Sequence, residues 1–460
     1  MPARLKLRTS AGAAPKAPTS ERTSAREASY ISKTQRRRAA KAANHKPMKT
    51  FNDLNHFAGF DWAKDHHNAV IIDRSGQIVE SFQFAHSGEG WKVWRQKIEA
   101  YPALAVAIET SHGAAVEQLL ESKATIYPMQ PKAAQRYRDR KVPSGSKTDF
   151  VDAWCFADAL RMDGHDWRAL SPRDPIVEEL RLLCRDEVEL ITQRTALVNQ
   201  LQAALHEYYP AALEAFDDWT KPYAWAFVQE FPTSQQLVKT TVHRRKVFLH
   251  KHHLWRPQTA EKRLEIFARA DQFCGGAPVT RAKSRLALSL IKLLQTLHKQ
   301  LEEYRAQIEK LFAEHPDHDL FGSLPGAGEK LAPRLLSEIG SDRSEYPDAQ
   351  SLQCVAGTAP VSFQSGQINR AKIRWHCNRS FRHTVHLWAD LSRKGCQWAA
   401  EYYARKRQEG KSHACALRCL GQRWLKILWR MWQNRMPYND SSHTERLARR
   451  LMPHCTSNHP

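Results

Sequence analysis

Hydrophobic residues between positions 56 and 129 come in short runs that suit buried strands. The stretch 56–84 reads HFAGFDWAKDHHNAVIIDRSGQIVESFQF, which predicts two strands joined by a turn at Asp73–Gly76. LAVAIET at 104–110 and ATIYPM at 124–129 predict two more short strands, and helical stretches are expected at 90–100 and 113–122. Strands that alternate with helices predict an α/β domain over residues 51–170.

From about residue 176 the apolar pattern changes to a helical period. Over 286–312 the apolar positions keep a 4-3 spacing that predicts a heptad seam needing a partner helix: Leu290, Leu294, Leu297, Leu301, Tyr304, Ile308 and Leu311. The stretch 176–208 has leucines at similar spacing, interrupted by Glu187 and Arg194. We therefore expect a helical coiled-coil region over 171–317. The pattern leaves open whether its two long stretches pair antiparallel within one chain or form a dimer arm.

Two segments beyond the first domain carry local signals of nucleic-acid contact. The stretch 243–258 reads HRRKVFLHKHHLWRPQ and is interpreted as a basic, His-rich loop. We expect this loop to contact nucleic acid or simply to be exposed, and not to bind zinc. In GSLPGAGEKLAPRLLSEIG at 322–340, a turn with Gly326 and Gly328 opens a helix, so that backbone N–H groups can face a phosphate. This segment resembles half of a helix-hairpin-helix, a sequence-independent binder of the DNA backbone. Tryptophans at helical spacing over 379–436 predict a helical core.

Charge narrows the class of partner. The 460 residues carry a formal net charge of +22. Residues 1–50 hold thirteen Lys and Arg against two Glu, which predicts a disordered basic tail for nucleic acid, with an organelle transit peptide as the alternative. The excess implies a polyanionic partner, most simply nucleic acid, and a basic surface kept for solubility is the weaker alternative.

Other features of the composition bear on the compartment. No apolar run approaches the roughly 18 residues of a membrane span, so we expect no membrane partner and a cytoplasmic, nucleoid-associated protein. The nine cysteines form no Cys-x-x-Cys pair, which indicates reduced thiols. Residues 441–460 are expected to form a C-terminal tail.

Four carboxylates stand where a phosphate-cleaving metal site would need them. Asp61 and Glu109 end strand-like runs, and Asp149 and Asp152 lie three apart, on one face of a predicted helix. Two Mg²⁺ ions in such a site require carboxylates from several elements. Taken singly, Asp149 is better explained as an N-cap, and Asp61 and Glu109 as solvated strand ends, than as metal ligands.

The motifs around these carboxylates resemble those of the DEDD-type transposases of bacterial insertion sequences. These proteins are also known as bridge-RNA-guided recombinases and are related to DNA invertases of the same type. The matching positions are Gly59, Asp61, Ala63, Lys64, Glu109, Ser111, Lys147, Thr148, Asp149, Asp152 and Ala153. The resemblance implies a RuvC-like domain (ribonuclease H fold) and a mainly helical serine transposase domain over 318–440. It also implies that Asp61, Glu109, Asp149 and Asp152 bind two Mg²⁺ ions, with Lys64 and Lys147 on the nucleic acid.

The second domain of that family carries a serine nucleophile. VAGTAPVSFQSGQ at 355–367 is similar to the family pattern, which makes Ser365 the expected nucleophile, although spacing alone does not exclude Ser362. His376 and Cys377 replace the family's usual Arg-Gly, a departure that concerns the geometry of this loop. Arg379 and Arg382 are expected to neutralise the attacked phosphate; a zinc site at His376, Cys377, His383 and His386 is the weaker alternative.

The predicted function is therefore DNA recombination that moves an insertion sequence through a covalent serine–DNA intermediate. The resemblance implies donor and target DNA as substrates, a structured guide RNA, and a homo-dimer or tetramer in which one protomer's carboxylates work with another's Ser365. Two other classes stay open: a metal-dependent junction-resolving nuclease and a non-catalytic nucleic-acid-binding protein.

Overall fold

The structure is a computed structural model that describes residues 51–122, 124–171 and 174–440 of the chain. The tails predicted at 1–50 and 441–460 lie outside the described residues. The chain divides into two compact units, residues 1–172 (unit 1) and residues 173–460 (unit 2). Within the described ranges, no helix combines the length and the apolar character needed to cross a bilayer.

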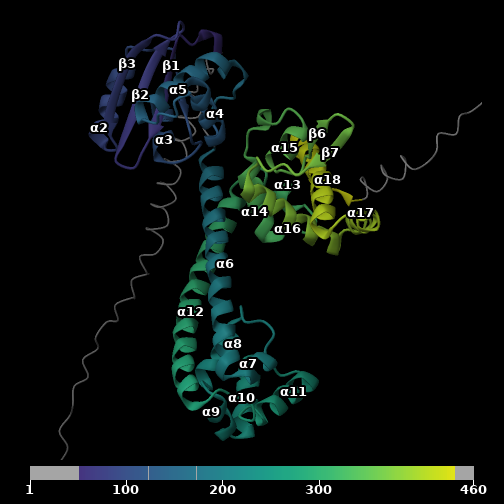
Figure 1. Ribbon diagram of the computed structural model, residues 1–460. Coiled ribbons are helices and arrows are strands. Elements are labelled where there is room, and N and C mark those ends of the chain that lie inside the picture. Colours follow the sequence, from purple (N-terminus) through teal and green to yellow (C-terminus); the bar gives the residue numbers. More distant parts are fainter. Residues whose placement is uncertain (1–50, 123, 172–173, 441–460) are drawn as a thin grey trace, which may run out of the picture. The chain divides into compact units, whose positions relative to one another are not determined.

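Unit 1 is built on a five-stranded sheet of mixed direction with the order β3-β2-β1-β4-β5 (Figure 1). β1 pairs antiparallel with β2, and β2 with β3, whereas β1, β4 and β5 run parallel. The strands are β1 (His56–Trp62), β2 (His66–Asp73), β3 (Ile78–Ala85), β4 (Leu104–Ile108) and β5 (Thr125–Pro128). The helices are α2 (Gly88–Ile98), α3 (Ala114–Glu121), α4 (Pro131–Lys141) and α5 (Asp149–Asp163), with short 3-10 turns at Phe51–Asp53 and Gly164–Asp166.

Helices cover both faces of this sheet. Trp94 of α2 and Val116 of α3 pack with Phe60 on one face. Ala134 of α4 and Phe156 of α5 pack with Phe57 on the other. The predicted α/β domain is thus confirmed. The stretch 56–84 contains three strands rather than two, because the chain turns back at residues 63–65 as well as at Asp73–Gln77.

Two long helices, α6 (Pro175–Tyr208) and α12 (Ala277–Ala313), form the stem of unit 2 and lie side by side (Figure 1). Ion pairs link Glu187 to Arg305 and Glu207 to Lys283, so the helices run antiparallel. The heptad seam is therefore satisfied within one chain. Glu187, which interrupts the seam, is only 2% exposed and also pairs with Arg334 of α14 (Gly328–Ile339).

Five short helices connect the far ends of the stem and share one apolar cluster with it. They are α7 (Pro210–Ala215), α8 (Pro222–Glu230), α9 (Ser234–Lys239), α10 (Val242–Lys251) and α11 (Pro257–Ala268). The loop predicted at 243–258 is wrong over most of its length, since α10 occupies Val242–Lys251. Its apolar residues Phe248 and Leu249 are buried in the cluster, which favours a helix over an exposed loop.

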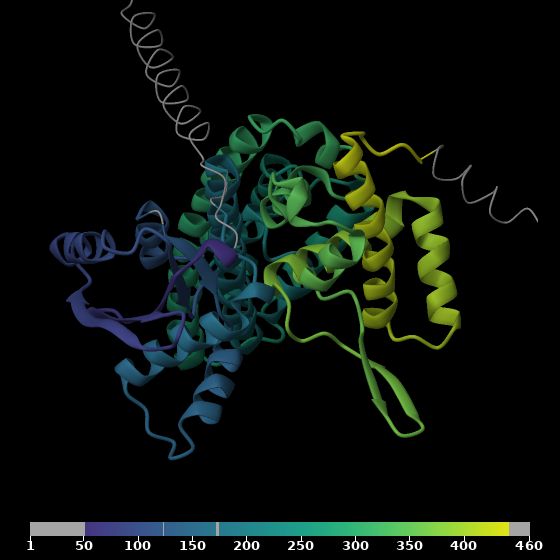
Figure 2. The same ribbon diagram turned by 90° about the horizontal axis from the view of Figure 1, so that it is seen from above.

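The remainder of unit 2 is a helical body with one β-hairpin. Its helices are α13 (His318–Gly322), α14, a 3-10 turn at Arg343–Glu345, α15 (Ala349–Val355), α16 (Arg379–Gly395), α17 (Gln397–Gln408) and α18 (His413–Asn434). The hairpin consists of β6 (Val361–Ser365) and β7 (Ile368–Lys372), and Figure 2 shows it projecting from the helices.

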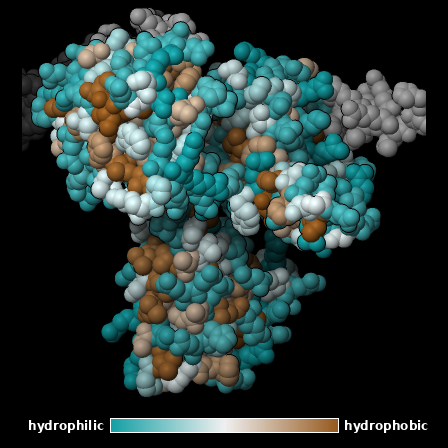
Figure 3. Space-filling view, turned by 45° about the horizontal axis from the view of Figure 1, so that its top comes forward, coloured by the Kyte–Doolittle hydropathy of each residue, from teal (hydrophilic) through white to brown (hydrophobic). Residues whose placement is uncertain are grey.

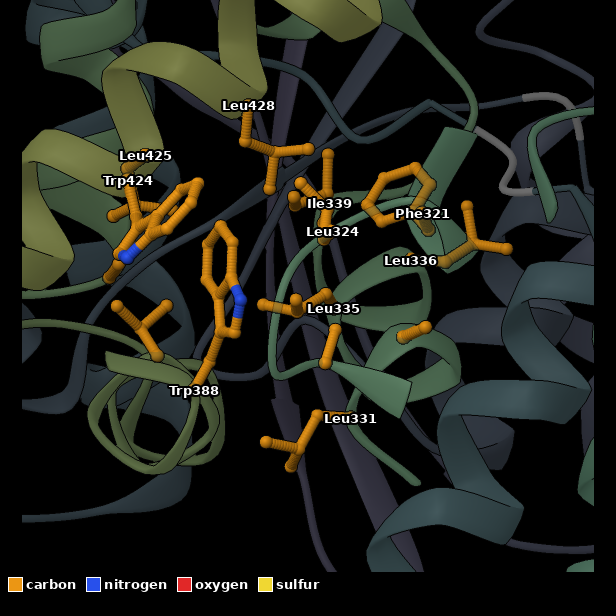
Figure 4. Packing of buried hydrophobic residues seen from close by; sticks show 14 of the residues in the cluster. Phe321, Leu324, Leu331, Leu335, Leu336, Ile339, Trp388, Trp424, Leu425 and Leu428 are labelled. Carbon is orange, nitrogen blue, oxygen red and sulfur yellow. The ribbon is translucent and has the colours of Figure 1, made fainter. Parts of the chain in front are cut away.

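The tryptophans of this body form its core, as predicted. Trp388, Trp424 and Trp432 are fully buried, and the Trp388 and Trp424 rings face each other with centroids 4.9 Å apart (Figure 4). The Trp424 indole N–H donates to Ser392, which satisfies its polar end. The same cluster includes residues of α6 and α12, so the predicted boundary at residue 317 falls inside unit 2.

The surface is mostly hydrophilic, with hydrophobic residues in small separate patches on the face that Figure 3 shows. Trp375, which follows the hairpin, is 71% exposed, and Phe273 is 79% exposed.

Candidate active site

Asp61 and Glu109 are brought together by the parallel pairing of β1 and β4. Side chains alternate between the two faces of a strand, so Asp61 shares a face with Phe57, which packs against α5. Phe60 pairs with Ile108, which makes Asp61 and Glu109 the next neighbours along the two strands. Both carboxylates are therefore expected on the side of the sheet that α5 covers.

Asp149 and Asp152 reach the same place because α5 lies unusually close to β1. A Cβ on Gly59 would stand 1.7 Å from the carbonyl oxygen of Ala153 and 2.6 Å from the backbone nitrogen of Ala157. Only glycine permits that approach, and the small Ala153 and Ala157 complete it. The first turn of α5 is thereby held over the end of β1.

Thr148, and not Asp149, is the N-cap of α5. The Thr148 hydroxyl accepts a hydrogen bond from the Val151 N–H at 3.2 Å. The interpretation of Asp149 as a cap is therefore wrong, and its carboxylate is left for other partners. Asp149 is 3.7 Å from His66 and 3.4 Å from the Asn68 amide.

Asp61 shows that the four carboxylates act on one another. Burial and the negative charges of Asp152, Asp149 and Glu109 together raise the pKa of Asp61 to about 6, against a weaker opposing effect of Lys147. Lys147 is thus close enough to Asp61 to affect its charge. Lys64 is exposed in the turn that follows β1.

The most buried member, Asp152, has its own cation. Its carboxylate forms an ion pair with Arg138 of α4, and only 8% of the Asp152 side chain is exposed. Arg138 thus neutralises one of the four charges in this structure. Sequence reasoning did not single out Arg138, although the basic run of α4 (Arg136, Arg138, Arg140, Lys141) precedes the motif directly.

The donor set suits a hard divalent cation. Carboxylate oxygens are the ligands that Mg²⁺ prefers, and an added cation would relieve the repulsion that raises the Asp61 pKa. As the side chains of the described residues stand, no group of three or more His, Cys, Asp or Glu is close enough to hold an ion. The site therefore fits a divalent cation in chemistry, and its side chains would have to converge to bind one.

Ser365 lies at the tip of the β6–β7 hairpin in unit 2. It is the last residue of β6 and pairs with Ile368 across a turn in which Gly366 takes a φ of +55°, a region that favours glycine. Ser365 is exposed, and its hydroxyl has no hydrogen-bond partner among the described residues. It is therefore accessible to a large substrate.

The hairpin gives Ser365 and Ser362 different surroundings. Cross-strand partners share a face, so Ser365 lies with Phe363, Arg370 and Lys372, and the Lys372 ammonium lies 3.7 Å from the Phe363 ring centroid. Ser362 lies on the opposite face with Gln364, Asn369 and Ala371. Only the face of Ser365 carries positive charge.

The His376-Cys377 pair lies directly before the cap of α16, which begins at Arg379. Cys377 packs against Gly357, where a Cβ would be 2.6 Å from its sulfur. Asn378 caps α16 by accepting a hydrogen bond from the Phe381 N–H and also donates to Glu338. Arg379 and Arg382 consequently lie in the first turn of α16, at the base of the hairpin rather than at its tip.

The two glycines of the 322–340 segment differ. Gly326 lies against the backbone of α16, since a Cβ there would be 2.5 Å from the Ser392 nitrogen. Gly328 has open space around it and begins α14, which has no side-chain cap. Of the two, Gly328 is therefore the one free to approach a phosphate.

Sequence comparison places both units among transposases. A model of DEDD transposases of the IS110 type, described as "Transposase", matches residues 58–210. A second, described as "Transposase IS116/IS110/IS902 family", matches residues 318–404.

Full-length relatives cover most of the chain. The mini-circle putative transposase for IS117 of Streptomyces coelicolor is 31% identical over 399 residues, which cover 85% of this chain and 96% of the relative. The IS110 uncharacterized 43.6 kDa protein of the same species is 26% identical, over 84% of this chain and 97% of the relative. The IS900 uncharacterized 42 kDa protein of Mycobacterium paratuberculosis is 29% identical, over 65% of this chain and 74% of the relative. The chain belongs to the IS116/IS110/IS902 family of transposases, enzymes that cleave and rejoin DNA.

Proposed function

We propose that this transposase moves an insertion sequence with two groups of residues, the four carboxylates of unit 1 and Ser365 of unit 2. The observation that carries the proposal is the electrostatic coupling of Asp61 to Glu109, Asp149 and Asp152, which come from separate elements. We infer that unit 1 is RuvC-like, with a ribonuclease H fold, because its mixed five-stranded sheet with helices on both faces suits that family. The α13–α14 pair is proposed to serve as the helix-hairpin-helix-like contact to the DNA backbone.

The bond changes balance without an external energy source. The Ser365 oxygen attacks a DNA phosphorus, the new Oγ–P bond replaces a P–O bond to deoxyribose, and the serine proton leaves as the departing oxygen gains one. A hydroxyl of another strand then attacks the phosphoserine, and the Oγ–P bond breaks. The number of phosphodiester bonds is unchanged.

The carboxylates would hold Mg²⁺, two ions by the pattern of the family: Asp61, Glu109, Asp149 and Asp152. Bound there, the ions would supply Lewis acidity toward phosphate oxygens. The chain itself supplies positive charge beside Asp61 from Lys147, and exposed Lys64 is proposed to contact the nucleic acid. With a cation bound to Asp152, Arg138 would exchange this partner for the substrate or for solvent.

The partners follow from the family. Donor and target DNA are the proposed substrates, and a structured guide RNA is proposed to select them. A dimer or tetramer is proposed because the carboxylates and Ser365 belong to different compact units, so that one protomer's carboxylates can serve another's serine. We place the protein in the cytoplasm, at the nucleoid.

The covalent step gives the sharpest test. Wild-type protein is incubated with Mg²⁺, radiolabelled DNA carrying the element's ends, and the RNA that copurifies from the native host. With wild-type protein we expect a labelled protein–DNA adduct that survives denaturation. The adduct should be lost in Ser365→Ala. It should be retained in Ser362→Ala, because Ser362 lies on the opposite face of the hairpin.

The same assay separates the alternative functions. Metal-dependent cleavage without any adduct would replace the serine mechanism with that of a nuclease. Neither cleavage nor adduct in wild-type protein, with stable nucleic-acid binding, would leave a binding protein. Normal recombination by Asp149→Asn would contradict the role of the carboxylates.

A further inference from the structure

A pocket lies at the base of the β6–β7 hairpin. It has a volume of about 330 Å³. Thr358, just before β6, and Ile373 and Trp375, just after β7, line one side. Side chains of α16 and α18 line the other.

Three arginines converge on this pocket: Arg379 and Arg382 from α16 and Arg418 from α18. No lining side chain is a carboxylate, and within the described chain none of the three forms an ion pair. Elsewhere in unit 2 other arginines have partners: Arg185 pairs with Glu338 at 2.9 Å, and buried Arg245 donates to backbone carbonyls. Three uncompensated guanidinium groups around one pocket repel one another, and an anion would relieve that cost.

The remaining walls suit a flat, partly apolar ligand. Trp375 is 71% exposed, and the Arg382 guanidinium lies 5.9 Å from its ring centroid. His383 and His386 also line the pocket, and burial lowers the pKa of each, assisted by the positive charge of Arg334 for His383 and by His413 for His386. Neutral imidazoles both donate and accept hydrogen bonds, as the edges of a base require.

We infer that this pocket binds one nucleotide of a nucleic-acid strand, with its phosphate on Arg379, Arg382 and Arg418 and its base against Trp375. Phosphate recognition by arginine and stacking of a base on an exposed aromatic ring are the two elements of single-strand binding. The inference rests on the proposed function only in taking nucleic acid as the ligand.

The hairpin sets this nucleotide apart from the one that Ser365 would attack. The pocket lies at the base of the hairpin and Ser365 at its tip, and a strand of five residues spans roughly 13 Å between its end residues. Arg379 and Arg382 thus anchor the strand at a distance from the cleaved bond, which differs from their expected role on the attacked phosphate.

The test uses full-length Ser365→Ala protein in EDTA, so that binding is measured without chemistry. Fluorescein-labelled oligonucleotides of one sequence, as single-stranded DNA, duplex DNA and single-stranded RNA, are titrated by anisotropy over a range of KCl concentrations. Arg418→Gln is compared with Arg430→Gln, a matched change on the same helix whose residue lies outside the pocket.

Arg418→Gln is expected to lower the slope of log K against log salt by about one and to weaken binding several-fold, whereas Arg430→Gln keeps the slope. The probe on which the loss occurs identifies the strand as DNA or RNA. Iodouracil-containing probes are expected to cross-link to Trp375, less so in Arg418→Gln. Equal slopes for both variants on all three probes, with no cross-link at Trp375, would overturn the inference.

Failure of this inference and failure of the proposed function are separable. A pocket that binds nucleotides while Ser365 forms no adduct would refute only the serine mechanism. An adduct that forms while the two arginine variants bind alike would refute only the pocket. Unfolding temperatures within about a degree of each other would confirm that both variants are folded.

Discussion

At the scale of single residues, the carboxylate site depends on Gly59, which has no side chain. Gly59 lets α5 approach β1, and that approach places Asp149 and Asp152 beside Asp61. The glycine two residues before the aspartate in the motif therefore has a packing role. Its substitution tests whether the geometry of the site follows from this contact.

Gly59→Ala is expected to destabilise the fold by about 1–3 kcal/mol, because its new methyl group would overlap the Ala153 carbonyl and push α5 away. Urea denaturation followed by circular dichroism measures the change. Gly88→Ala is the control, since a Cβ at Gly88, the first residue of α2, meets nothing within 4 Å. Equal stability of the two variants would contradict the close approach.

Asp61→Asn is expected to abolish recombination and yet to stabilise the metal-free protein. A pKa raised from 3.8 to about 6 means that folding disfavours the charged carboxylate. The penalty is absent below pH 4, grows between pH 4 and 6, and is complete above pH 6. With allowance for partial exposure, we expect the variant to be more stable by about 1 kcal/mol at neutral pH and no more stable at pH 4. Thermal unfolding in EDTA at the two pH values measures the difference.

Arg138→Gln is expected to have opposite effects without and with a divalent cation. Without one, buried Asp152 loses its counter-charge and the unfolding temperature falls by several degrees. With Mg²⁺, the ion no longer competes with a guanidinium, so the temperature rise caused by the ion becomes larger than in the wild type. Arg136→Gln, an exposed change on the same helix, controls for lost basic charge. Parallel shifts in both variants would show that Arg138 does not compete with the cation.

At the scale of elements, the stem and the hairpin differ in how much of their surface is buried. The stem buries a heptad seam and, within it, the charge of Glu187 between Arg305 and Arg334. The hairpin buries little, since every residue of both strands is exposed. The stem is thus held by buried contacts, whereas the hairpin leaves Ser365 exposed.

Glu187→Gln is expected to destabilise unit 2 by about 3 kcal/mol, because it leaves two arginines facing an uncharged, buried position. Glu303→Gln is the control, as it removes an exposed pair with Lys299 at 3.9 Å on the same stem and should change stability by less than about 0.5 kcal/mol. Guanidinium unfolding of both variants measures the difference. Similar losses in the two would mean that the buried network adds no stability.

At the scale of the whole molecule, net charge governs how tightly the protein binds any nucleic acid. The charge of +22 is spread over the chain, and residues 1–50 contribute thirteen Lys and Arg. Binding of this kind is driven by counterion release and depends steeply on salt. It is distinct from the proposed chemistry at Ser365.

Removal of residues 1–50 is expected to weaken binding to an unrelated DNA duplex by about tenfold or more at low salt and to flatten its salt dependence. Formation of the serine adduct should persist in the shortened protein, since Ser365 and the four carboxylates lie outside the deleted segment. Anisotropy titrations and the adduct assay measure the two effects. Loss of the adduct with unchanged binding would give the tail a role beyond its charge.

The sequence by itself determined the α/β character of unit 1, the helical character of unit 2 and the family. Each follows from local pattern: apolar runs of strand length, a heptad repeat, and motifs such as Lys147 to Ala153 whose residues are close in the chain. Strand and helix periods are properties of neighbouring residues, so a sequence displays them directly. The sequence pattern did not predict the helix at 242–251, because basic and histidine residues surround its two buried apolar residues, Phe248 and Leu249.

Only the tertiary structure decided what depends on residues far apart in the chain. It pairs the two long helices within one chain, assigns the cap of α5 to Thr148, and brings Arg138 onto Asp152. It also brings Arg418 of α18 to Arg379 and Arg382 of α16, which no spacing in the sequence indicates. The physical reason is that charge pairing and close packing act through space, between positions whose separation along the chain carries no signal.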